Sequence, residues 1–439
     1  MLNFIIGRNN SGKTEKIRAL IAERASENKK CILIVPEQFS FESERSILEK
    51  IGAQKMLNVD ILSFTRLAFV INEQYGKALN KTIDDGTRKV LMSLSLEALS
   101  GKLEYFKRFS SKPALLSNLL TFVTELKQCA VTPDEIAEIS GKTGNKSLGK
   151  KLSELSLIAA SYDAVVSRSF FDDENLLTIA ADMRSETDFF DGKAVYFDAF
   201  CGFTKQERNC IKSILPKAEN VFISLCTDRD LSREGVSVFE NVNSEFSHLK
   251  ECAAEQNVGV SSPEILNVKE DGRSPELVYL EKYLCGEESE PYKEECDNIV
   301  VCAAGNRADE ADFVACEIKK LLRCNPTLRC RNIAVIERTA GTYDKELSES
   351  FKKYGVPMFE DKRRPIGIQP VMVFVKCLLA LCAEGFSTES FMRLLKTGLT
   401  ALSGDEISEL ENYAFLWNID GSKWRRDFTE NPDGLGFDV

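Results

Sequence analysis

The chain has 439 residues, 43% of them hydrophobic and 28% charged, which is enough for roughly two or three independent cores. With His248 as its single histidine, the chain can hardly build histidine-based catalytic triads or His-rich zinc sites, and we expect His248 at the surface. The formal net charge of −11 argues against general coating of nucleic acid, because that binding depends on Lys and Arg neutralising phosphates.

The sequence predicts a parallel α/β domain built from five strands. Apolar runs rich in β-branched residues predict these strands at Leu2–Ile6, Cys31–Val35, Leu57–Leu62, Ala194–Asp198 and Val221–Leu225. A helix with an apolar face at Ile17, Leu20 and Ile21 follows the first strand. Strands that alternate with helices form parallel sheets, so we expect the fold class to be α/β.

The remaining segments predict an insertion and a second unit. Leucines at helical spacing between Lys81 and Arg184 predict an inserted helical subdomain over 81–184. Residues 231–297 are irregular and include an acidic linker at Gly286–Glu295. Strands at Ile299–Cys302 and Ile333–Ile336 around a helix at Glu310–Leu322 predict a second α/β unit over 298–375, and 376–439 begins a further helical subdomain that looks truncated.

Between the first strand and its helix lies a G-x-x-x-x-G-K-T phosphate-binding loop, Gly7–Thr14. In such a loop, backbone N–H groups surround the β-phosphate, the lysine reaches the β and γ oxygens, and the threonine hydroxyl binds Mg²⁺. We therefore predict that the chain binds ATP and Mg²⁺, and the alternative is a P-loop fold that no longer binds nucleotide. The predicted nucleotide-binding residues are Gly7, Arg8, Asn9, Asn10, Ser11, Gly12, Lys13, Thr14 and Asp198. Asn10 stands where glycine is common, and asparagine tolerates the positive φ that this position requires.

Asp198 ends a predicted strand and is the candidate acid that holds Mg²⁺ together with Thr14. The alternative role for Asp198 is a helix cap at the end of the strand. Efficient ATPases often carry a glutamate beside this acid to orient the attacking water, yet Ala199 follows here, so we assign no catalytic residue. Gln206 is a candidate γ-phosphate sensor by analogy only.

Lys13 and Asp198 are far enough apart to require a domain-sized insertion, as in helicase-type motors. Distinctive segments follow the P-loop in order: Ile34-Val-Pro-Glu-Gln-Phe-Ser40, Ile61-Leu-Ser-Phe-Thr-Arg-Leu-Ala68, Tyr196-Phe-Asp-Ala-Phe-Cys-Gly-Phe-Thr204, Arg331-Asn-Ile-Ala-Val-Ile-Glu-Arg338 and Tyr354-Gly-Val-Pro-Met-Phe-Glu-Asp-Lys-Arg-Arg-Pro365. With these segments, the chain resembles the AddB (RexB) subunits of AddAB helicase-nucleases, relatives of the UvrD-like superfamily 1 helicases.

The resemblance implies a RecA-like parallel sheet, formed by 1–80 and 185–230, with a helical insertion and a second, incomplete α/β helicase lobe. It also implies a heterodimer with an AddA-like helicase-nuclease subunit that is the working motor, binding of DNA, a contribution to Chi recognition, and a role in double-strand break repair by homologous recombination. Family members are more than twice this length. Their C-terminal nuclease domain and its iron–sulfur cluster fall in a part that this chain lacks, so we expect an N-terminal fragment.

The same resemblance places single-stranded DNA against two segments, Gln38 with Phe39 and Ser63-Phe64-Thr65-Arg66. Base stacking on Phe64 and a phosphate contact by Arg66 are the leading expectations. The alternative is that Phe64 is a core residue and Arg66 a surface ion-pair partner.

Several general expectations remain. No C-x-x-C pair occurs among the fourteen cysteines, so we expect most to be reduced core residues. No apolar run of about 18 residues occurs and the first strand begins at Leu2, which predicts a cytoplasmic protein without a membrane partner. Lys362-Arg363-Arg364 is a candidate basic patch or a solvated turn. A self-sufficient superfamily 1 DNA helicase is the alternative function, and a small-molecule kinase is a further one.

Overall fold

The computed structural model describes residues 1–75, 81–107, 112–167, 170–171, 173–182, 188–228, 238–268, 272–283, 290–360 and 366–428. The chain divides into two compact units, Met1–Ile299 and Val300–Val439. The candidate basic patch Lys362-Arg363-Arg364 and residues 286–289 of the acidic linker lie outside the described residues.

Among the described residues of the first unit, six strands form an all-parallel sheet in the order β3-β2-β6-β7-β1-β8. The strands are β1 (Leu2–Gly7), β2 (Cys31–Ile34), β3 (Val59–Leu62), β6 (Ala194–Phe197), β7 (Asn220–Cys226) and β8 (Glu264–Ile265). The predicted α/β class and the five predicted strands are confirmed. Strand β8 was not predicted, because a two-residue strand carries no periodic pattern. The P-loop strand β1 is separated from β6 by β7, which pairs with both.

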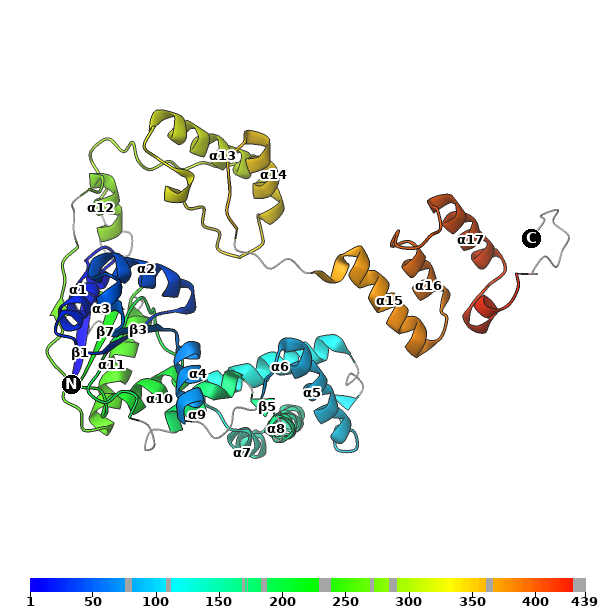
Figure 1. The fold of residues 1–439 in the computed structure, drawn as a ribbon, viewed down its shortest axis with the longest axis horizontal. Coiled ribbons are helices and arrows are strands. Elements are labelled where there is room, and N and C mark those ends of the chain that lie inside the picture. The colour runs from blue at the N-terminus through cyan, green and yellow to red at the C-terminus, as the bar shows by residue number, and fades with distance from the viewer. Residues whose placement is uncertain are drawn as a thin grey trace. The chain divides into compact units, whose positions relative to one another are not determined.

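Helices cover both faces of this sheet (Figure 1). One face packs against α1 (Lys13–Ser26), α2 (Ser40–Ile51) and α3 (Ala53–Met56), and the short helix η1 (Glu37–Phe39) precedes α2. The other packs against α4 (Phe64–Tyr75), α9 (Asp173–Asp182), α10 (Lys205–Ile214) and α11 (Glu240–Glu255). Alternate side chains of β1 supply the two cores, since Ile5 belongs to the first and Phe4 and Ile6 to the second. Because both faces are buried, the central strands are largely apolar, and β2 and β6 are buried at every position.

The helical insertion has a separate core. It contains α5 (Asp85–Ala98), α6 (Pro113–Gln128), α7 (Pro133–Lys142), α8 (Lys146–Val166) and a short parallel pair, β4 (Lys81–Thr82) with β5 (Phe170–Phe171). The buried carboxylate of Glu154 accepts hydrogen bonds from the backbone N–H groups of Glu104, Tyr105 and Phe106, at 2.7–3.1 Å. This fixes the turn that follows α5.

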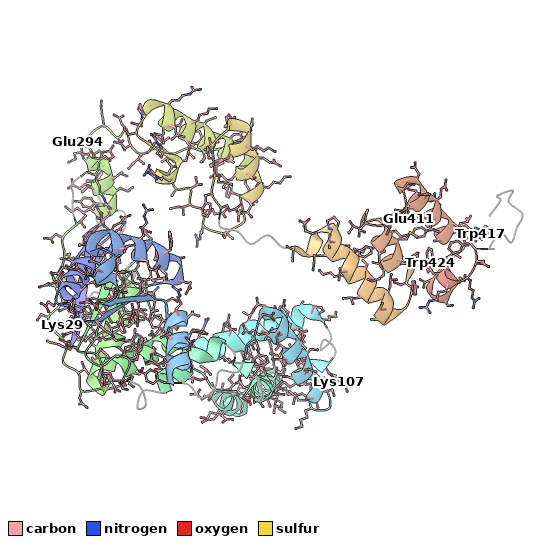
Figure 2. The ribbon with its side chains drawn as sticks, in the orientation of Figure 1. Lys29, Lys107, Glu294, Glu411, Trp417 and Trp424 are labelled. Carbon is pink, nitrogen blue, oxygen red and sulfur yellow. The ribbon has the colours of Figure 1, made fainter. Side chains whose placement is uncertain are left out.

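The second unit is helical in its described residues. Its elements are α13 (Arg307–Cys324), η4 (Cys330–Asn332), α14 (Asp344–Tyr354), η5 (Ile366–Ile368), α15 (Pro370–Glu384), α16 (Thr388–Leu395), α17 (Gly404–Leu416) and η6 (Gly421–Arg425). The predicted helix at 310–322 is confirmed within α13. Figure 2 marks Trp424 among the last helices. Its ring packs on that of Phe391 with centroids 4.6 Å apart, and its indole N–H donates a hydrogen bond to the Thr388 hydroxyl.

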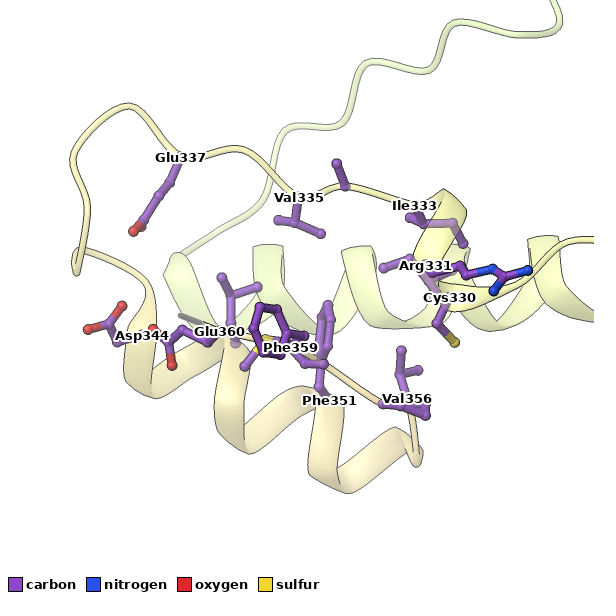
Figure 3. Close-up of a pocket in the computed structure, with 15 residues that line it drawn as sticks. Cys330, Arg331, Ile333, Val335, Glu337, Asp344, Phe351, Val356, Phe359 and Glu360 are labelled. Atoms are coloured by element: carbon purple, nitrogen blue, oxygen red, sulfur yellow. The ribbon is translucent and has the colours of Figure 1, made fainter. Parts of the chain in front are cut away.

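The two strands predicted in the second unit are wrong. Ile299–Cys302 and Ile333–Ile336 run without strand pairing, and Val301 and Ile336 are 93% and 91% exposed. A strand needs a neighbour to satisfy its backbone N–H and C=O groups, and none of the described residues supplies one here. Figure 3 shows Ile333 and Val335 on the extended segment beside α13, facing a pocket of about 770 Å³ that Phe351 of α14 and Phe359 also line.

Other general expectations have mixed outcomes. His248 is exposed, as predicted. Most of the described cysteines are not core residues: Cys31, Cys210 and Cys377 are buried, but more are exposed, because many lie on outer helix faces or on unpaired segments. The described part of the chain holds no group of three or more His, Cys, Asp and Glu side chains arranged as metal ligands. Nor does any helix in the described ranges combine the length and the apolarity that crossing a membrane requires.

Candidate nucleotide-binding site

The predicted phosphate-binding loop joins the end of β1 to the start of α1. Gly7 is the last residue of β1, and α1 begins at Lys13. Gly12 has φ 89° and Asn10 has φ 60°, so both adopt the left-handed conformation, which fits the tolerance expected of asparagine. A Cβ atom on Gly7 would lie 2.8 Å from the Leu266 carbonyl oxygen and closer still to the Ser11 hydroxyl, so only glycine fits there.

The Lys13 side chain lies within this loop. Its ammonium group donates to the carbonyl oxygens of Gly7 and Arg8, at 2.7 and 2.8 Å, and lies 3.5 Å from the Ser11 hydroxyl. The loop thus surrounds a cation at the N-terminus of α1, where the helix dipole also favours an anion. Thr14 follows in the first turn of the same helix.

Asp198 lies at the same edge of the sheet. It directly follows β6, and because the strands are parallel, the carboxyl ends of β6 and β1 lie on either side of β7 at one edge. Its carboxylate is 5% exposed and accepts a hydrogen bond of 2.5 Å from the Ser224 hydroxyl of β7. This contact ties the buried acid to β7, the strand that lies between β6 and the P-loop strand β1.

The residue after Asp198 has an unusual backbone. Ala199 has φ 65°, a left-handed conformation that costs a residue other than glycine about 1–2 kcal/mol. Strain of this kind concentrates at functional sites. The methyl group of Ala199 stands where an efficient ATPase often carries a carboxylate.

Gln206 is buried in α10. Its side-chain amide donates to the Thr178 hydroxyl of α9 at 2.8 Å. Its neighbour Glu207 forms a capping box with Thr204 at the start of α10. Burial raises the pKa of the Glu207 carboxyl, against the opposing hydrogen bond from the Thr204 backbone N–H. A γ-phosphate contact by Gln206 would require this side chain to leave Thr178.

The predicted DNA-contact residues occupy different environments. Phe64 is 6% exposed and packs on the rings of Phe197, Phe200 and Phe203, as the core alternative expects, so stacking on a base would require this cluster to open. Arg66 is exposed and lies 3.6 Å from the Glu44 carboxylate. Ser63 is buried, and its hydroxyl accepts a hydrogen bond from the backbone N–H of Arg66. The other three predicted DNA-contact residues, Gln38, Phe39 and Thr65, are exposed. DNA contact by these residues stays a prediction.

Two arginines make contacts at this loop that the sequence pattern did not assign: Arg8, which belongs to the loop, and Arg273, which lies beside it. The guanidinium of Arg8 donates to the carbonyl oxygen of Glu281, at 2.6 Å, in α12 (Pro275–Tyr283). Arg273, just before α12, lies 3.0 and 3.3 Å from the side-chain oxygen of Asn10 when that amide faces it. Arg273 is therefore a second candidate cation for a phosphate group at the loop.

Comparison with known families decides the relationship of this chain. Residues 4–281 match the family model described as "ADDB, N-terminal", which is more than half of the chain. The chain belongs to the AddB family. The matched range contains the phosphate-binding loop, Asp198, the helical insertion and almost all of α12.

Three curated relatives of this AddB-family chain are each named as the B subunit of an ATP-dependent helicase/deoxyribonuclease. The protein from Clostridium novyi (strain NT) is 32% identical over 425 residues, which cover 96% of this chain and 37% of that protein. Those from Acetivibrio thermocellus and Clostridium tetani are each 31% identical, over 96% of this chain and 37% and 38% of their own lengths. The chain thus spans little more than a third of the length of these relatives.

Sequence reasoning missed Arg273 for a simple reason. Arg273 lies in the segment that looked irregular, 259 residues beyond Thr14 (273 − 14), and no spacing rule connects it to the loop. A usable signal was the Ser274-Pro275 pair, which is typical of a helix start and predicts an ordered element there. This AddB-family chain therefore holds a phosphate-binding loop that includes Arg8, with the buried Asp198 at the same edge of the sheet and Arg273 against the loop.

Proposed function

We propose that this chain is the N-terminal, nucleotide-binding part of the B subunit of a helicase-nuclease that processes double-strand DNA breaks for homologous recombination. It binds ATP and Mg²⁺, contacts single-stranded DNA, and works in a heterodimer with an AddA-like motor subunit. The name of its relatives, a subunit of an ATP-dependent helicase and deoxyribonuclease, supports this role.

The observation that carries the nucleotide proposal is the shape of the loop from Gly7 to Thr14. Gly7 allows a close approach that no other residue allows, and Gly12 supplies the left-handed turn before α1. Lys13 provides the charge for the β and γ oxygens. Thr14 and Asp198 would hold Mg²⁺, which when bound would neutralise charge on the polyphosphate.

We further propose that the chain binds ATP but does not turn it over at motor rates. The support is the methyl group of Ala199 beside Asp198, where a water-orienting carboxylate would be expected. Gln206 does not obviously replace it, because its amide is engaged with Thr178. The partner subunit then supplies the motor, and this chain contributes to DNA binding and to Chi recognition.

Equilibrium binding of a fluorescent ATP analogue, with and without Mg²⁺, tests the site. Lys13→Ala is expected to weaken binding by tenfold or more, and Asp198→Asn to remove most of the dependence on Mg²⁺. Ala199→Glu is expected to raise the slow hydrolysis rate without tightening binding. Equal affinity of the wild type and Lys13→Ala would contradict the proposal.

The alternative is a self-sufficient superfamily 1 helicase. DNA-stimulated ATP hydrolysis with strand separation by the purified chain, both lost in Lys13→Ala, would favour it. Single-stranded DNA binding is tested separately by Arg66→Ala, which is expected to weaken binding and to lower its salt dependence. Phosphoryl transfer to a small acceptor without DNA would instead support a kinase.

A further inference from the structure

Helix α12 is attached to the phosphate-binding loop near both of its ends. At its C-terminus, the Arg8 guanidinium donates to the carbonyl oxygens of Glu281 and Lys282, at 2.6 and 3.5 Å. The Nε atom of Arg8 also lies 3.1 Å from the Glu281 carboxylate. Just before the N-terminus, Arg273 lies against Asn10 of the same loop.

The contact of Arg8 is well placed to be strong. The last carbonyl groups of a helix carry partial negative charge, so a guanidinium there gains from the helix dipole as well as from the carboxylate. Arg8 and Glu281 are only 18% and 22% exposed, and the Phe239 ring lies 5.6 Å from the guanidinium. Water therefore screens this ion pair less than it screens an exposed one.

Helix α12 also holds the segment that leads out of the first unit. The buried Glu276 carboxylate accepts hydrogen bonds from the backbone N–H and the side-chain amide of Asn298, at 3.1 and 2.5 Å. The Tyr279 hydroxyl donates to the Glu290 carbonyl oxygen, and its ring packs on that of Tyr292 at 5.1 Å. A continuous chain of contacts thus runs from the phosphate-binding loop through α12 to Asn298, one residue before the unit ends.

The position of Arg8 within the loop links these contacts to phosphate binding. Its carbonyl oxygen accepts a hydrogen bond from Lys13, the residue that a polyphosphate would attract. Its guanidinium, on the same residue, is held by Glu281. An anionic ligand at the loop competes for this guanidinium with one carboxylate and two neutral backbone carbonyl oxygens, and a polyphosphate carries a larger charge than these partners together.

We propose that Arg8 is a latch residue: it holds α12 against the loop, and it exchanges Glu281 for the phosphates of a bound nucleotide, which loosens α12 and residues 290–298. The proposal rests on nucleotide binding at Gly7–Thr14. It makes the segment that leads to the second unit responsive to the occupancy of this loop. Because coupling is reciprocal, weakening the latch from the Glu281 side strengthens nucleotide binding.

The two sides of the ion pair supply the decisive test, with binding of Mg²⁺–ATP to the 439-residue chain as the readout. Glu281→Ala removes the carboxylate and leaves only the two backbone carbonyl contacts to the guanidinium, so it is expected to lower the dissociation constant about threefold, whereas Arg8→Ala is expected to raise it about tenfold. An ion pair that only stabilises the fold would shift both variants in the same direction. Arg8→Lys, which retains charge but not the fork of donors, is expected to fall between the wild type and Arg8→Ala.

Hydrogen exchange measures the latch itself. Without added nucleotide, the amides of 276–283 and Asn298 are expected to exchange faster in Arg8→Ala than in the wild type. Saturating Mg²⁺–ATP should raise exchange in the wild type toward the level of Arg8→Ala and leave that variant unchanged. Arg45→Ala, which removes an exposed ion pair with Glu49, is the control and should resemble the wild type in both assays.

The outcomes separate the latch from the proposed function. Unchanged exchange of α12 in Arg8→Ala without nucleotide overturns the latch, whatever the chain binds. Nucleotide binding that leaves α12 unchanged in the wild type, or that both substitutions weaken equally, overturns the coupling alone. A wild-type chain that binds no Mg²⁺–ATP overturns the proposed function, and the coupling with it.

Discussion

The substitution Gly7→Ala should disrupt the phosphate-binding loop, because the added methyl group has no room there. The new Cβ would lie 2.8 Å from the Leu266 carbonyl oxygen, a backbone atom whose residue is held by its own hydrogen bond of 2.7 Å to Ile6. It would lie closer still to the Ser11 hydroxyl, which borders the Lys13 ammonium group. Relief requires the backbone to move, and overpacking of this kind costs about 1–3 kcal/mol.

Two measurements check this prediction. The midpoint of thermal unfolding of the first unit should fall by about 2 °C or more, and the dissociation constant for Mg²⁺–ATP should rise by about tenfold or more, because Ser11 and Lys13 are displaced together. Gly202→Ala is the matched control, since a Cβ there meets nothing within 4 Å and its φ is not positive. If Gly7→Ala binds ATP and unfolds as the wild type does, the loop is not packed as described.

Three further predictions follow from the surrounding structure. Arg208→Ala should lower the free energy of unfolding by on the order of 3 kcal/mol in urea titrations, because it leaves Glu245, 6% exposed and 2.8 Å away, buried without its cation; a loss below about 1 kcal/mol would contradict this. Burial raises the pKa of the Glu207 carboxyl, so this group stabilises the fold fully at acidic pH and less as pH rises through its pKa in the folded chain. Glu207→Gln should therefore unfold at a higher temperature than the wild type at pH 7, and at about the same temperature near about pH 4. Glu135 occupies a similar capping box, but there the hydrogen bond from the Thr132 backbone N–H lowers the pKa of the carboxyl. Glu135→Gln should therefore lower the unfolding temperature at pH 7. If the two Gln variants shift the unfolding temperature in the same direction, the reasoning is refuted. Amides of 334–336 should show little protection in hydrogen exchange, since these residues form no backbone hydrogen bond with any residue that the structure describes. Protection like that of β6 would show that a strand forms there.

The sequence alone was sufficient for the parallel sheet because its strands are buried on both faces. Continuous apolar runs such as Cys31–Ile34 leave little choice but a central strand, and the glycine loop after β1 fixes the direction of the chain. The same reasoning failed at Ile333–Ile336, where the run is equally apolar. A pattern of apolar residues indicates that a segment favours the strand conformation, but a strand also requires a neighbouring strand to pair with. No described residue pairs with Ile333–Ile336.

The candidate site divides in the same way. The positions of Lys13 and Asp198 were predictable, because Lys13 belongs to a G-x-x-x-x-G-K-T pattern between a strand and a helix and Asp198 ends a strand signal, and parallel topology brings such strand ends to one edge. Arg273 and the contact of Arg8 with α12 were not predictable, because they depend on how a segment without a periodic pattern packs against the loop. Phe64 shows a different limit of sequence reasoning: its motif resembles a DNA-contact segment, whereas its ring is buried in the core.

Steady-state ATP hydrolysis by the purified chain, with and without single-stranded DNA and alongside Lys13→Ala, tests the central claim most directly when ATP binding is measured on the same samples. The account predicts Lys13-dependent binding of Mg²⁺–ATP with slow turnover that DNA does not accelerate to motor rates. Rapid, DNA-stimulated hydrolysis that disappears in Lys13→Ala would show that Ala199 does not limit the reaction and would contradict the account.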